Sequence, residues 1–490
     1  MNISTAPSCP APFNMAAYVL ATAESDPSKT ALVIAGPDHA AQWSYGELQT
    51  AVQGIAAGLL ARGLTPGDRI LLRLGNTVEF PLAYLGAIWA GMLPVPTSAA
   101  LTAPEITAIA AELDPALVIA GEGIALPDHP APVLPEAELH AMESHGTTPA
   151  NMGDPNRPAY IIYTSGTSGR PRGVVHAHRA VWARRMMWEG WYGLQPDDRL
   201  LHAGAFNWTY TLGTGLMDPW AIGATALIAA PGTTPQQLPA LMARHGATLF
   251  AAAPGVFRQM LRHHGDLTVP TLRHGLSAGE KLPEPIRTAW NNATGTMIYE
   301  ALGMSECSTF ISGSPDRPAP PGATGYPQPG RRVMVRDSGE LAIHASDPGL
   351  MLGYLNAPEE TAARYEDDWF LTGDTVSQGE DGAITYLGRD DDMMNAGGYR
   401  VSPLEVEAAL TSHPDITAAA AVEAEVKANT TVIRTFYTST TPLPEEVLES
   451  YAAARLARYK CPRIFTHVAA LPQSANGKIN RRALREHPLP

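Results

Sequence analysis

The sequence predicts an α/β fold, with a large amino-terminal domain of layered α/β subdomains, a small β-rich subdomain, and a small α+β carboxy-terminal domain. Three observations support this prediction. The chain has 490 residues, which is more than one hydrophobic core usually serves. Short apolar strands alternate with amphipathic stretches of helical length through the first part of the chain. From about residue 325 onward the pattern changes to short strands and turns.

The composition is that of a globular protein, with 45% apolar and 17% charged residues. The net charge of −14 argues against nonspecific nucleic-acid binding, which needs a basic surface. Cys9, Cys307 and Cys461 lie far apart and match no metal or disulfide spacing, so we expect a cytoplasmic protein. We expect no signal peptide, and the long apolar stretch Ile70–Val95 contains charged residues, so we expect no membrane span.

The amino-terminal elements are predicted from apolar spacing. Strands joined through helices of ten or more residues imply parallel pairing. Residues 121–157, rich in proline, glycine and polar residues, are interpreted as a connection. The predicted elements are a helix at 47–61, a strand at 69–74, helices at 77–90 and 103–113, and a strand at 117–120.

A second α/β series follows the connection. The hairpin-type pair Asp381-Gly382 marks the β-rich part, and a charged, glycine-containing break at 388–392 precedes the last hundred residues. We therefore predict domains at 1–390 and 391–490. The predicted elements are a helix at 177–191, a strand at 200–203, segments at 213–222, 225–229, 235–245, 249–252, 255–263 and 273–278, a strand at 296–299, a helix at 402–412, strands at 416–422 and 430–438, and a helix at 445–457.

The stretch Tyr160–Gly173, which reads YIIYTSGTSGRPRG, organises the functional prediction. An apolar strand opens into a loop of glycines and hydroxyls, which can wrap backbone N–H groups around an anion. The common P-loop spacing G-x-x-x-x-G-K-[ST] is absent, because Pro171 stands five residues after Gly166. Taken alone, the stretch is equally compatible with a flexible surface loop.

Further polar clusters follow apolar runs, and each taken singly is also compatible with an ordinary turn. Gly279 would let a flat ligand approach the backbone, and Glu306 beside Ser305 could hold Mg²⁺ against a triphosphate. Asp374 could accept hydrogen bonds from both hydroxyls of a ribose. The clusters are Ser277-Ala278-Gly279-Glu280, Leu302-Gly303-Met304-Ser305-Glu306, Trp369-Phe370-Leu371-Thr372-Gly373-Asp374, Gly388-Arg389-Asp390-Asp391-Asp392, Asn395-Ala396-Gly397-Gly398-Tyr399-Arg400 and a glycine turn carrying Lys478.

In this order, the motifs resemble those of the adenylate-forming superfamily, in particular its acyl- and aryl-CoA synthetases. YTSGTSGRPRGV is similar to its phosphate loop, SAGE and LGMSE to its adenine and Mg²⁺ segments, and FLTGD to its ribose segment. GRDDD is similar to its hinge and SANGKINR to its catalytic-lysine turn. The resemblance covers nearly the whole chain and implies ATP, Mg²⁺ and coenzyme A as ligands.

The resemblance implies a role for each matching residue. Lys478 would be the catalytic lysine, Asp391 the pivot of a rotating carboxy-terminal lid, and Glu306 the Mg²⁺ ligand, with Thr164 and Arg172 completing the catalytic set. Asp374 and Arg389 would hold the ribose. ATP or AMP would also contact Thr164, Ser165, Gly166, Thr167, Ser168, Gly169, Ala278, Gly279, Glu280, Leu302, Gly303, Met304 and Ser305, and Gly397, Gly398 and Tyr399 would line the CoA tunnel.

Three positions depart from the family's pattern. Arg172 stands where the loop usually has lysine, so a planar fork replaces a point charge. Leu302 stands where an aromatic residue usually stacks on adenine. The segment AAAVEAEVKANTTVIRTFYT lacks the usual V-P-D-x-x-x-G-E turn, which affects the expected contact with the CoA nucleotide.

The acid is expected to bind near Phe206–Gly213. Asn207 stands where amino-acid-activating relatives carry aspartate, so amino acids are disfavoured and an aryl or compact hydrophobic acid is favoured. Trp208, Tyr210 and Phe310 could instead be core or lid packing. The predicted pocket comprises Asn207, Trp208, Tyr210, Ala278, Gly303, Thr309 and Phe310.

Two acceptors remain open for the activated acid. The first is the CoA thiol, favoured by the N-A-G-G-Y-R pattern and by the lack of a carrier domain after Lys478. The second is the pantetheine of a carrier protein acting in trans. A catalytically inactive binding protein is disfavoured, because Lys478, Glu306 and Asp374 are all present. We expect a monomer or homodimer without nucleic-acid partners.

Overall fold

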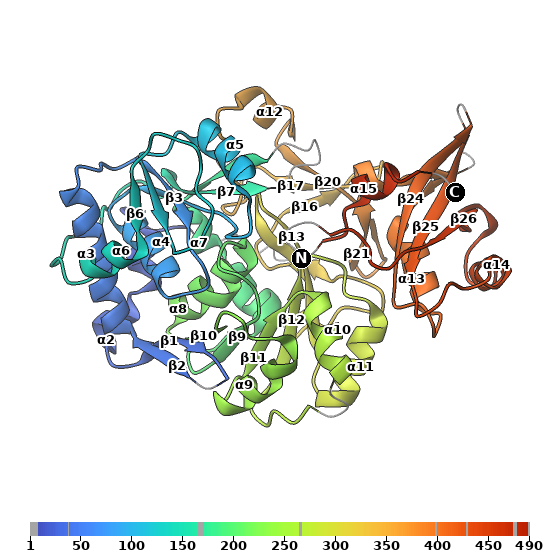
Figure 1. Cartoon of the computed structure of the whole chain (residues 1–490), viewed down its shortest axis with the longest axis horizontal. Helices are drawn as coiled ribbons and strands as arrows, with labels where there is room; N and C mark the ends of the chain where they lie inside the picture. The colour runs from blue at the N-terminus through green and yellow to red at the C-terminus, as the bar shows by residue number, and fades with distance from the viewer. Residues whose placement is uncertain are drawn as a thin grey trace. The chain divides into compact units, whose positions relative to one another are not determined.

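The computed structural model describes residues 8–37, 39–164, 171–263, 267–396, 399–427, 430–473 and 478–488. The chain divides into two compact units, whose elements are labelled in Figure 1. The first unit is Met1–Val333 with Ile343–Phe370, and the second is Met334–Ala342 with Leu371–Pro490. The predicted boundary between residues 390 and 391 lies inside the second unit and stays a prediction.

A nine-stranded sheet organises the first unit, in the order β15-β14-β13-β12-β11-β9-β10-β1-β2. The strands from β13 to β1 in this order pair in parallel, as the alternation of strands and helices predicted, and the outer strands β2, β14 and β15 pair antiparallel. The strands are β1 (Thr30–Ala35), β2 (Ala40–Ser44), β9 (Arg199–His202), β10 (Thr225–Ala229), β11 (Leu249–Ala252), β12 (His274–Ala278), β13 (Ile298–Met304), β14 (Ser308–Ser312) and β15 (Tyr326–Pro327).

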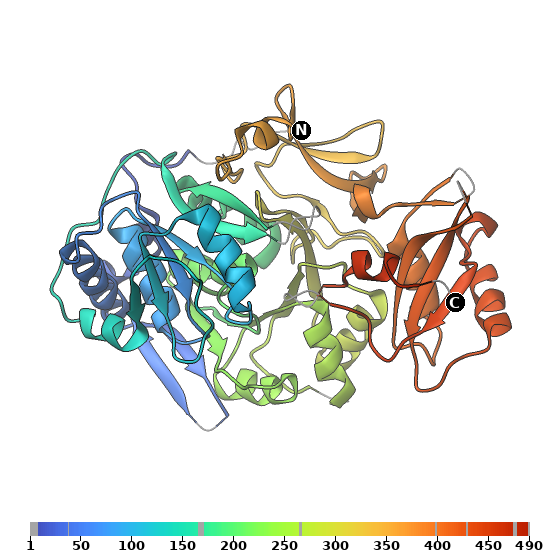
Figure 2. The same cartoon turned by 45° about the horizontal axis from the view of Figure 1, so that its top comes forward.

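Both faces of this sheet are covered by apolar side chains. On one face, α9, α10 and α11 pack through Leu241, Phe257 and Trp290 against Phe250, as the three helices grouped in Figures 1 and 2 illustrate. A second cluster contains Tyr210 and Trp208, two of the three aromatic residues that were expected near the acid pocket. The helices near this sheet are η2 (Thr211–Met217), α8 (Asp218–Ile222), η3 (Pro235–Gln237), α9 (Leu238–Arg244), α10 (Pro254–His263) and α11 (Glu284–Thr294).

A second, four-stranded parallel sheet has the order β4-β3-β5-β6. Capping boxes begin its neighbouring helices α3 and α5, where Ser44 pairs with Glu47 and Thr102 with Glu105. The predicted helix 103–113 and strand 117–120 are confirmed. The elements are α1 (Met15–Val19), α2 (Thr22–Ser25), α3 (Tyr45–Ala61), β3 (Arg69–Arg73), α4 (Glu79–Trp89), β4 (Leu93–Pro96), α5 (Ala103–Leu113), β5 (Leu117–Ala120), β6 (Val133–Pro135) and α6 (Glu136–Met142).

A three-stranded sheet, β18-β8-β7, presents the glycine-rich segment. The prediction of one helix over 177–191 is wrong. Strand β8 extends to Ala177 because it pairs with β7, and two short helices follow, of which η1 is a π-helix. The elements are β7 (Pro158–Thr164), β8 (Arg172–Ala177), α7 (Arg179–Ala183), η1 (Trp188–Tyr192), β18 (Gly353–Tyr354) and α12 (Pro358–Ala362).

The β-rich part forms a five-stranded sheet. Strands β20 and β21 form the predicted hairpin, and Gly382 has a φ of 82°, a backbone conformation that favours glycine. Strand β20 begins in the first unit and ends in the second. The strands are β16 (Val333–Val335), β17 (Glu340–His344), β19 (Tyr365–Glu366), β20 (Trp369–Gln378) and β21 (Ile384–Arg389).

The rest of the second unit contains the sheet β24-β25-β26 and a short ribbon of β22 and β23. Two apolar clusters, one around Tyr437 and one around Phe436, cover opposite faces of β25. In the part of the chain that the structure describes, no helix combines the length and apolar character needed to cross a bilayer. The elements are η4 (Asp390–Asp392), β22 (Met394–Ala396), β23 (Tyr399–Val401), α13 (Pro403–Thr411), β24 (Ala418–Lys427), β25 (Thr430–Thr438), α14 (Glu445–Ala453), η5 (Arg458–Lys460), β26 (Ile464–His467) and α15 (Arg481–Arg485).

Candidate active site

The hairpin β7–β8 brings the two ends of the glycine-rich loop together. Thr164, the last residue of β7, pairs with Arg172, the first residue of β8. The Arg172 guanidinium forms an ion pair of 2.8 Å with Glu360 and lies 5.4 Å from the centre of the Tyr354 ring. The predicted phosphate contacts Ser165, Gly166, Thr167, Ser168 and Gly169 lie outside the described residues.

The turn Ser305–Cys307 between β13 and β14 is tied to this hairpin by two hydrogen bonds. Tyr354, on the strand paired with β8, donates its hydroxyl hydrogen to Glu306 Oε1 at 2.8 Å. His176 on β8 donates from Nε2 to the Ser305 carbonyl at 2.7 Å. Burial lowers the pKa of His176 to about 4, so its ring is neutral at pH 7. The structure thus brings the hairpin residues Thr164 and Arg172 and the Ser305–Glu306 turn into one region.

The predicted adenine segments end two neighbouring parallel strands, since Ala278 on β12 pairs with Ala301 on β13. Gly279 has a φ of 96°, and a Cβ there would lie 2.7 Å from Trp208 Cζ2. The residue therefore has to be glycine for both backbone and packing reasons. Leu302, Met304 and Glu280 are half-buried, whereas Gly303 is exposed at the end of β13.

The predicted acid pocket contains an aromatic group beside Gly279. The Trp208 and Tyr210 rings meet edge to face at 5.1 Å, and the Tyr210 hydroxyl donates to the Leu276 carbonyl at 3.0 Å. Tyr210 and Phe310 are buried, as the core-packing alternative requires, while Trp208 and Asn207 are half-buried. Thr309 is buried near Met187, to whose sulfur its hydroxyl donates.

A buried charge network behind this aromatic group was not anticipated from the sequence. Arg184 donates from Nε and Nη2 to both carboxylate oxygens of Asp218, at 2.8 and 2.6 Å. Tyr192 donates to Asp218 at 2.7 Å, and Arg184 also donates to Ser308. The sequence feature that could have revealed this network is a charged residue within an apolar stretch, because a buried charge needs a partner. His176 and Tyr354 were missed too, because their contacts join segments distant in sequence.

In the second unit, the predicted ribose residues form a pair. Asp374 and Arg389 are opposite each other on β20 and β21, and Arg389 Nη1 lies 3.4 Å from Asp374 Oδ1. Asp374 is buried, and Arg389 also donates to the Thr372 carbonyl at 3.2 Å. The pair forms a small polar site that can present one carboxylate to vicinal hydroxyls.

The other predicted residues of the second unit are described in part. Asp391 lies in the short helix η4, and its side chain is outside the described set. Gly397 and Gly398 also lie outside it, and Tyr399 is described only as the start of β23. Lys478 is exposed and stands next to Ile479, which bridges antiparallel to Gln473. The turn residues 474–477 lie outside the described residues, and the role of Lys478 stays a prediction.

Glu306 is the predicted Mg²⁺ ligand. Mg²⁺ in nucleotide sites usually binds one or two carboxylates, phosphate oxygens and water. Glu306 fits this pattern, because it is a half-buried carboxylate oriented by the Tyr354 hydroxyl. Among the described residues, no group of three or more His, Cys, Asp and Glu side chains is arranged to hold a metal by itself.

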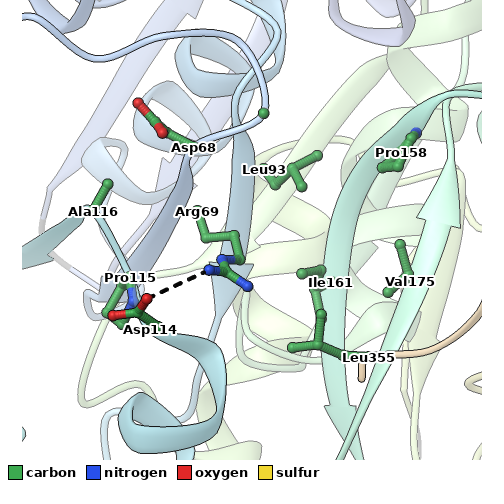
Figure 3. Close-up of a pocket in the computed structure, with 11 residues that line it drawn as sticks. Asp68, Arg69, Leu93, Asp114, Pro115, Ala116, Pro158, Ile161, Val175 and Leu355 are labelled. Atoms are coloured by element: carbon green, nitrogen blue, oxygen red, sulfur yellow. Dashed lines mark ion pairs between the residues drawn. The ribbon is translucent and has the colours of Figure 1, made fainter. Parts of the chain in front are cut away.

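A cleft of about 440 Å³ lies elsewhere in the first unit, at the amino ends of β3, β4 and β5. Figure 3 shows Arg69 extending into it toward Ile161 and Leu355, with an ion pair of 3.8 Å to Asp114. The lining residues differ from those predicted for the active site. Ile161 belongs to β7, so the cleft borders the hairpin that carries the glycine-rich loop.

Comparison with protein families identifies two matching regions. Residues 19–355 match the model described as AMP-binding enzyme, and residues 405–478 match the AMP-binding enzyme C-terminal domain. The first match covers more than half of the chain.

Individual relatives are similar over nearly their whole length. A 3-hydroxybenzoate–CoA ligase of Aromatoleum sp. is 30% identical, with 90% of this chain and 91% of the relative covered. A 4-hydroxybenzoate–CoA/benzoate–CoA ligase of Rhodopseudomonas palustris is 32% identical, with coverages of 91% and 89%. Among solved structures, a benzoate CoA ligase from Burkholderia xenovorans has a TM-score of 0.83 and 29% identity, with coverages of 96% and 100%.

Proposed function

The chain belongs to the AMP-binding enzyme family, in the acyl- and aryl-CoA synthetase branch of the adenylate-forming superfamily, and on that premise we propose that it makes aryl-CoA thioesters. It is an ATP-dependent, AMP-forming ligase. The proposed substrate is an aryl carboxylic acid, which reacts with ATP to give an aryl-adenylate and pyrophosphate. The CoA thiol then displaces AMP.

The observation that carries this proposal is the connection between the hairpin and the turn. The Arg172 guanidinium lies 5.4 Å from the centre of the Tyr354 ring, and the Tyr354 hydroxyl donates to Glu306 at 2.8 Å. This contact supports the proposal that a cation and a carboxylate flank the polyphosphate of ATP. Two anions, the substrate carboxylate and ATP, can react only where such groups balance the charge.

In the proposed first step, the protein's contribution is positioning and charge. Thr164 and the loop hold the pyrophosphate portion, and Glu306 would hold Mg²⁺, which supplies charge neutralisation when bound. Lys478 neutralises charge at the α-phosphate while the carboxylate attacks. Asp374 and Arg389 hold the ribose. In the second step a CoA thiol needs no dedicated strong base, because a few per cent is already thiolate at neutral pH.

An aryl acid is proposed for the following reasons. Asn207 is neutral, so it offers no partner for an ammonium group. Trp208 lies so close to Gly279 that an added Cβ would be 2.7 Å from its Cζ2 atom, which places an aromatic ring beside the substrate segment. The relatives named above act on benzoate or hydroxybenzoates by their names.

Coenzyme A is the proposed acceptor, with residues 391–490 acting as a mobile lid in which Gly397, Gly398 and Tyr399 line the thiol tunnel. The relatives, of whose lengths 91% and 89% are covered, are CoA ligases by their names, which supports this choice. A pantetheinylated carrier protein is the alternative acceptor.

The test is a panel of acids, each assayed for AMP release and thioester formation with free CoA and with a pantetheinylated carrier protein. We expect aryl acids with CoA to give the highest rates. A preference for long-chain fatty acids would contradict the proposed pocket. A thioester formed on the carrier but not on CoA would contradict the proposed acceptor.

A further inference from the structure

Two buried polar side chains beside the proposed acid pocket lack hydrogen-bond partners among the described residues. They are His202, at the end of β9, and Thr211, at the start of the π-helix η2. Both residues have 0% exposure, and the atoms without partners are His202 Nε2 and Thr211 Oγ1. A buried polar atom without a partner destabilises the folded protein, so such atoms in an otherwise well-packed region need an explanation.

Both side chains lie next to Gly204. A Cβ on Gly204 would lie 2.3 Å from Thr211 Oγ1 and 3.1 Å from His202 Nδ1, and a Cβ on Gly215 would lie 2.9 Å from His202 Cβ. The segment is fixed by Asn76, which donates to the Gly204 carbonyl at 3.2 Å and accepts from the Phe206 N–H at 2.8 Å. Two glycines therefore make room for these polar groups in an apolar surrounding.

The hydrogen of the His202 ring can be assigned from its contacts. The Gly204 N–H donates to His202 Nδ1 at 2.9 Å, so Nδ1 carries no hydrogen in the neutral ring. Burial lowers the pKa of His202 to about 3, which keeps the ring neutral at pH 7. Nε2 therefore carries the hydrogen and is a donor, whereas the Thr211 hydroxyl can both donate and accept.

Both groups lie among the aromatic residues of the proposed pocket. The His202 ring meets Tyr210 edge to face at 4.4 Å and Trp208 at 6.5 Å. The Tyr210 hydroxyl hydrogen is already donated to the Leu276 carbonyl. His202 and Thr211 thus lie beside the aromatic rings of Tyr210 and Trp208, against which an aryl acid would pack.

We infer that His202 and Thr211 form a subsite for a hydroxyl group on the ring of the acid. A phenolic hydroxyl accepts from His202 Nε2–H and donates to Thr211 Oγ1, which satisfies both atoms at once. A methyl group satisfies neither, and an aromatic amine is a poor acceptor for the histidine hydrogen. The inference rests on the proposed function and narrows its substrate class to hydroxyaryl acids.

The first experiment uses the wild-type protein. kcat/KM for thioester formation is measured with benzoate and with the hydroxy-, methyl- and amino-benzoates substituted at each ring position. We expect one hydroxybenzoate to exceed its methyl counterpart by about tenfold or more, the equivalent of one hydrogen bond. Equal values for hydroxy and methyl acids at every position would overturn the subsite.

The second experiment compares Thr211→Val and His202→Phe with Thr225→Val as a matched control. Thr225 is also buried on this sheet, but its hydroxyl donates to the Thr30 carbonyl at 2.9 Å. The two subsite variants should lower the hydroxy-to-methyl ratio about tenfold, and the control should leave it unchanged. An equal loss with both acids would show a structural role only and would overturn the inference.

The failures of the subsite and of the proposed function are distinguishable. Benzoate turned over without a preference for any hydroxybenzoate would overturn the subsite alone. No thioester from any aryl acid would overturn the proposed function, and this inference with it. If a variant does not fold, the comparison of hydroxy- and methyl-benzoates with the wild-type protein decides whether the subsite exists.

Discussion

At the scale of single residues, Arg172 is the position where this protein departs most clearly from its family's phosphate loop. Its guanidinium is shared between Glu360 and the Tyr354 ring, and Tyr354 in turn donates to Glu306. The ion pair is partly exposed, so its own contribution to stability is small. We therefore propose that the role of Arg172 is to place positive charge at the start of β8.

We predict that Arg172→Lys retains adenylation within about tenfold, because the positive charge remains. Arg172→Gln, which removes the charge, should lose more than that. Acid-dependent ATP–pyrophosphate exchange measures both variants. A loss above about tenfold in the lysine variant, about 1.4 kcal/mol of barrier, would show that the planar fork is required.

His178 gives a prediction about pH. Its Nδ1 accepts from the Met15 N–H at 3.1 Å, and burial lowers its pKa from 6.5 to about 3. Between these values the unfolded chain binds a proton that the folded chain does not. The contribution of neutral His178 to the free energy of unfolding is therefore complete above pH 6.5, and it decreases as the pH falls below this value.

The expected loss for this histidine is about 1.4 kcal/mol per pH unit, or about 2 kcal/mol on going from pH 7.5 to 5. Urea unfolding at the two pH values should show it as a lower midpoint in the wild type. In His178→Gln the shift should be smaller. An identical shift in wild type and variant would contradict the assignment.

At the scale of secondary structure, the site depends on strand ends and on two π-helices. The sequence was sufficient to associate Ala278 and the Leu302–Glu306 segment with the ends of strands, but β13 runs to Met304, so Leu302 lies inside the strand and not after it as expected. The π-helices η1 and η2 were not predictable, because their extra residue per turn leaves no distinct apolar period. The contact between Trp208 and Gly279 could not be predicted either, because these residues are 71 positions apart in the sequence.

Gly279→Ala tests this packing. The φ of 96° and the approach of Trp208 Cζ2 to 2.7 Å both oppose a Cβ, so we expect at least about 1–2 kcal/mol of lost stability and a marked loss of adenylation. Gly255→Ala in α10 is the control, because a Cβ there meets nothing within 4 Å. Chemical unfolding and pyrophosphate exchange measure both. Equal behaviour of the two variants would contradict the role given to Gly279.

At the scale of the whole molecule, the predicted residues divide between two compact units. The phosphate, adenine and acid segments belong to the first, and Asp374, Arg389 and Lys478 belong to the second. The order of motifs was enough to anticipate the family, and the alternation of strands and helices was enough to anticipate the parallel sheet. The contacts of Arg184 with Asp218 and of His176 with Ser305 required the folded chain, because each joins residues that are distant in the sequence.

The most direct measurement separates the two half-reactions in Lys478→Ala. In the wild type, we expect aryl-acid-dependent ATP–pyrophosphate exchange and aryl-CoA formation. In Lys478→Ala, exchange should be nearly abolished, while supplied aryl-adenylate should still react with CoA, because the lysine acts on the α-phosphate in the first step only. Equal loss of both half-reactions, or exchange that persists without Lys478, would contradict the account.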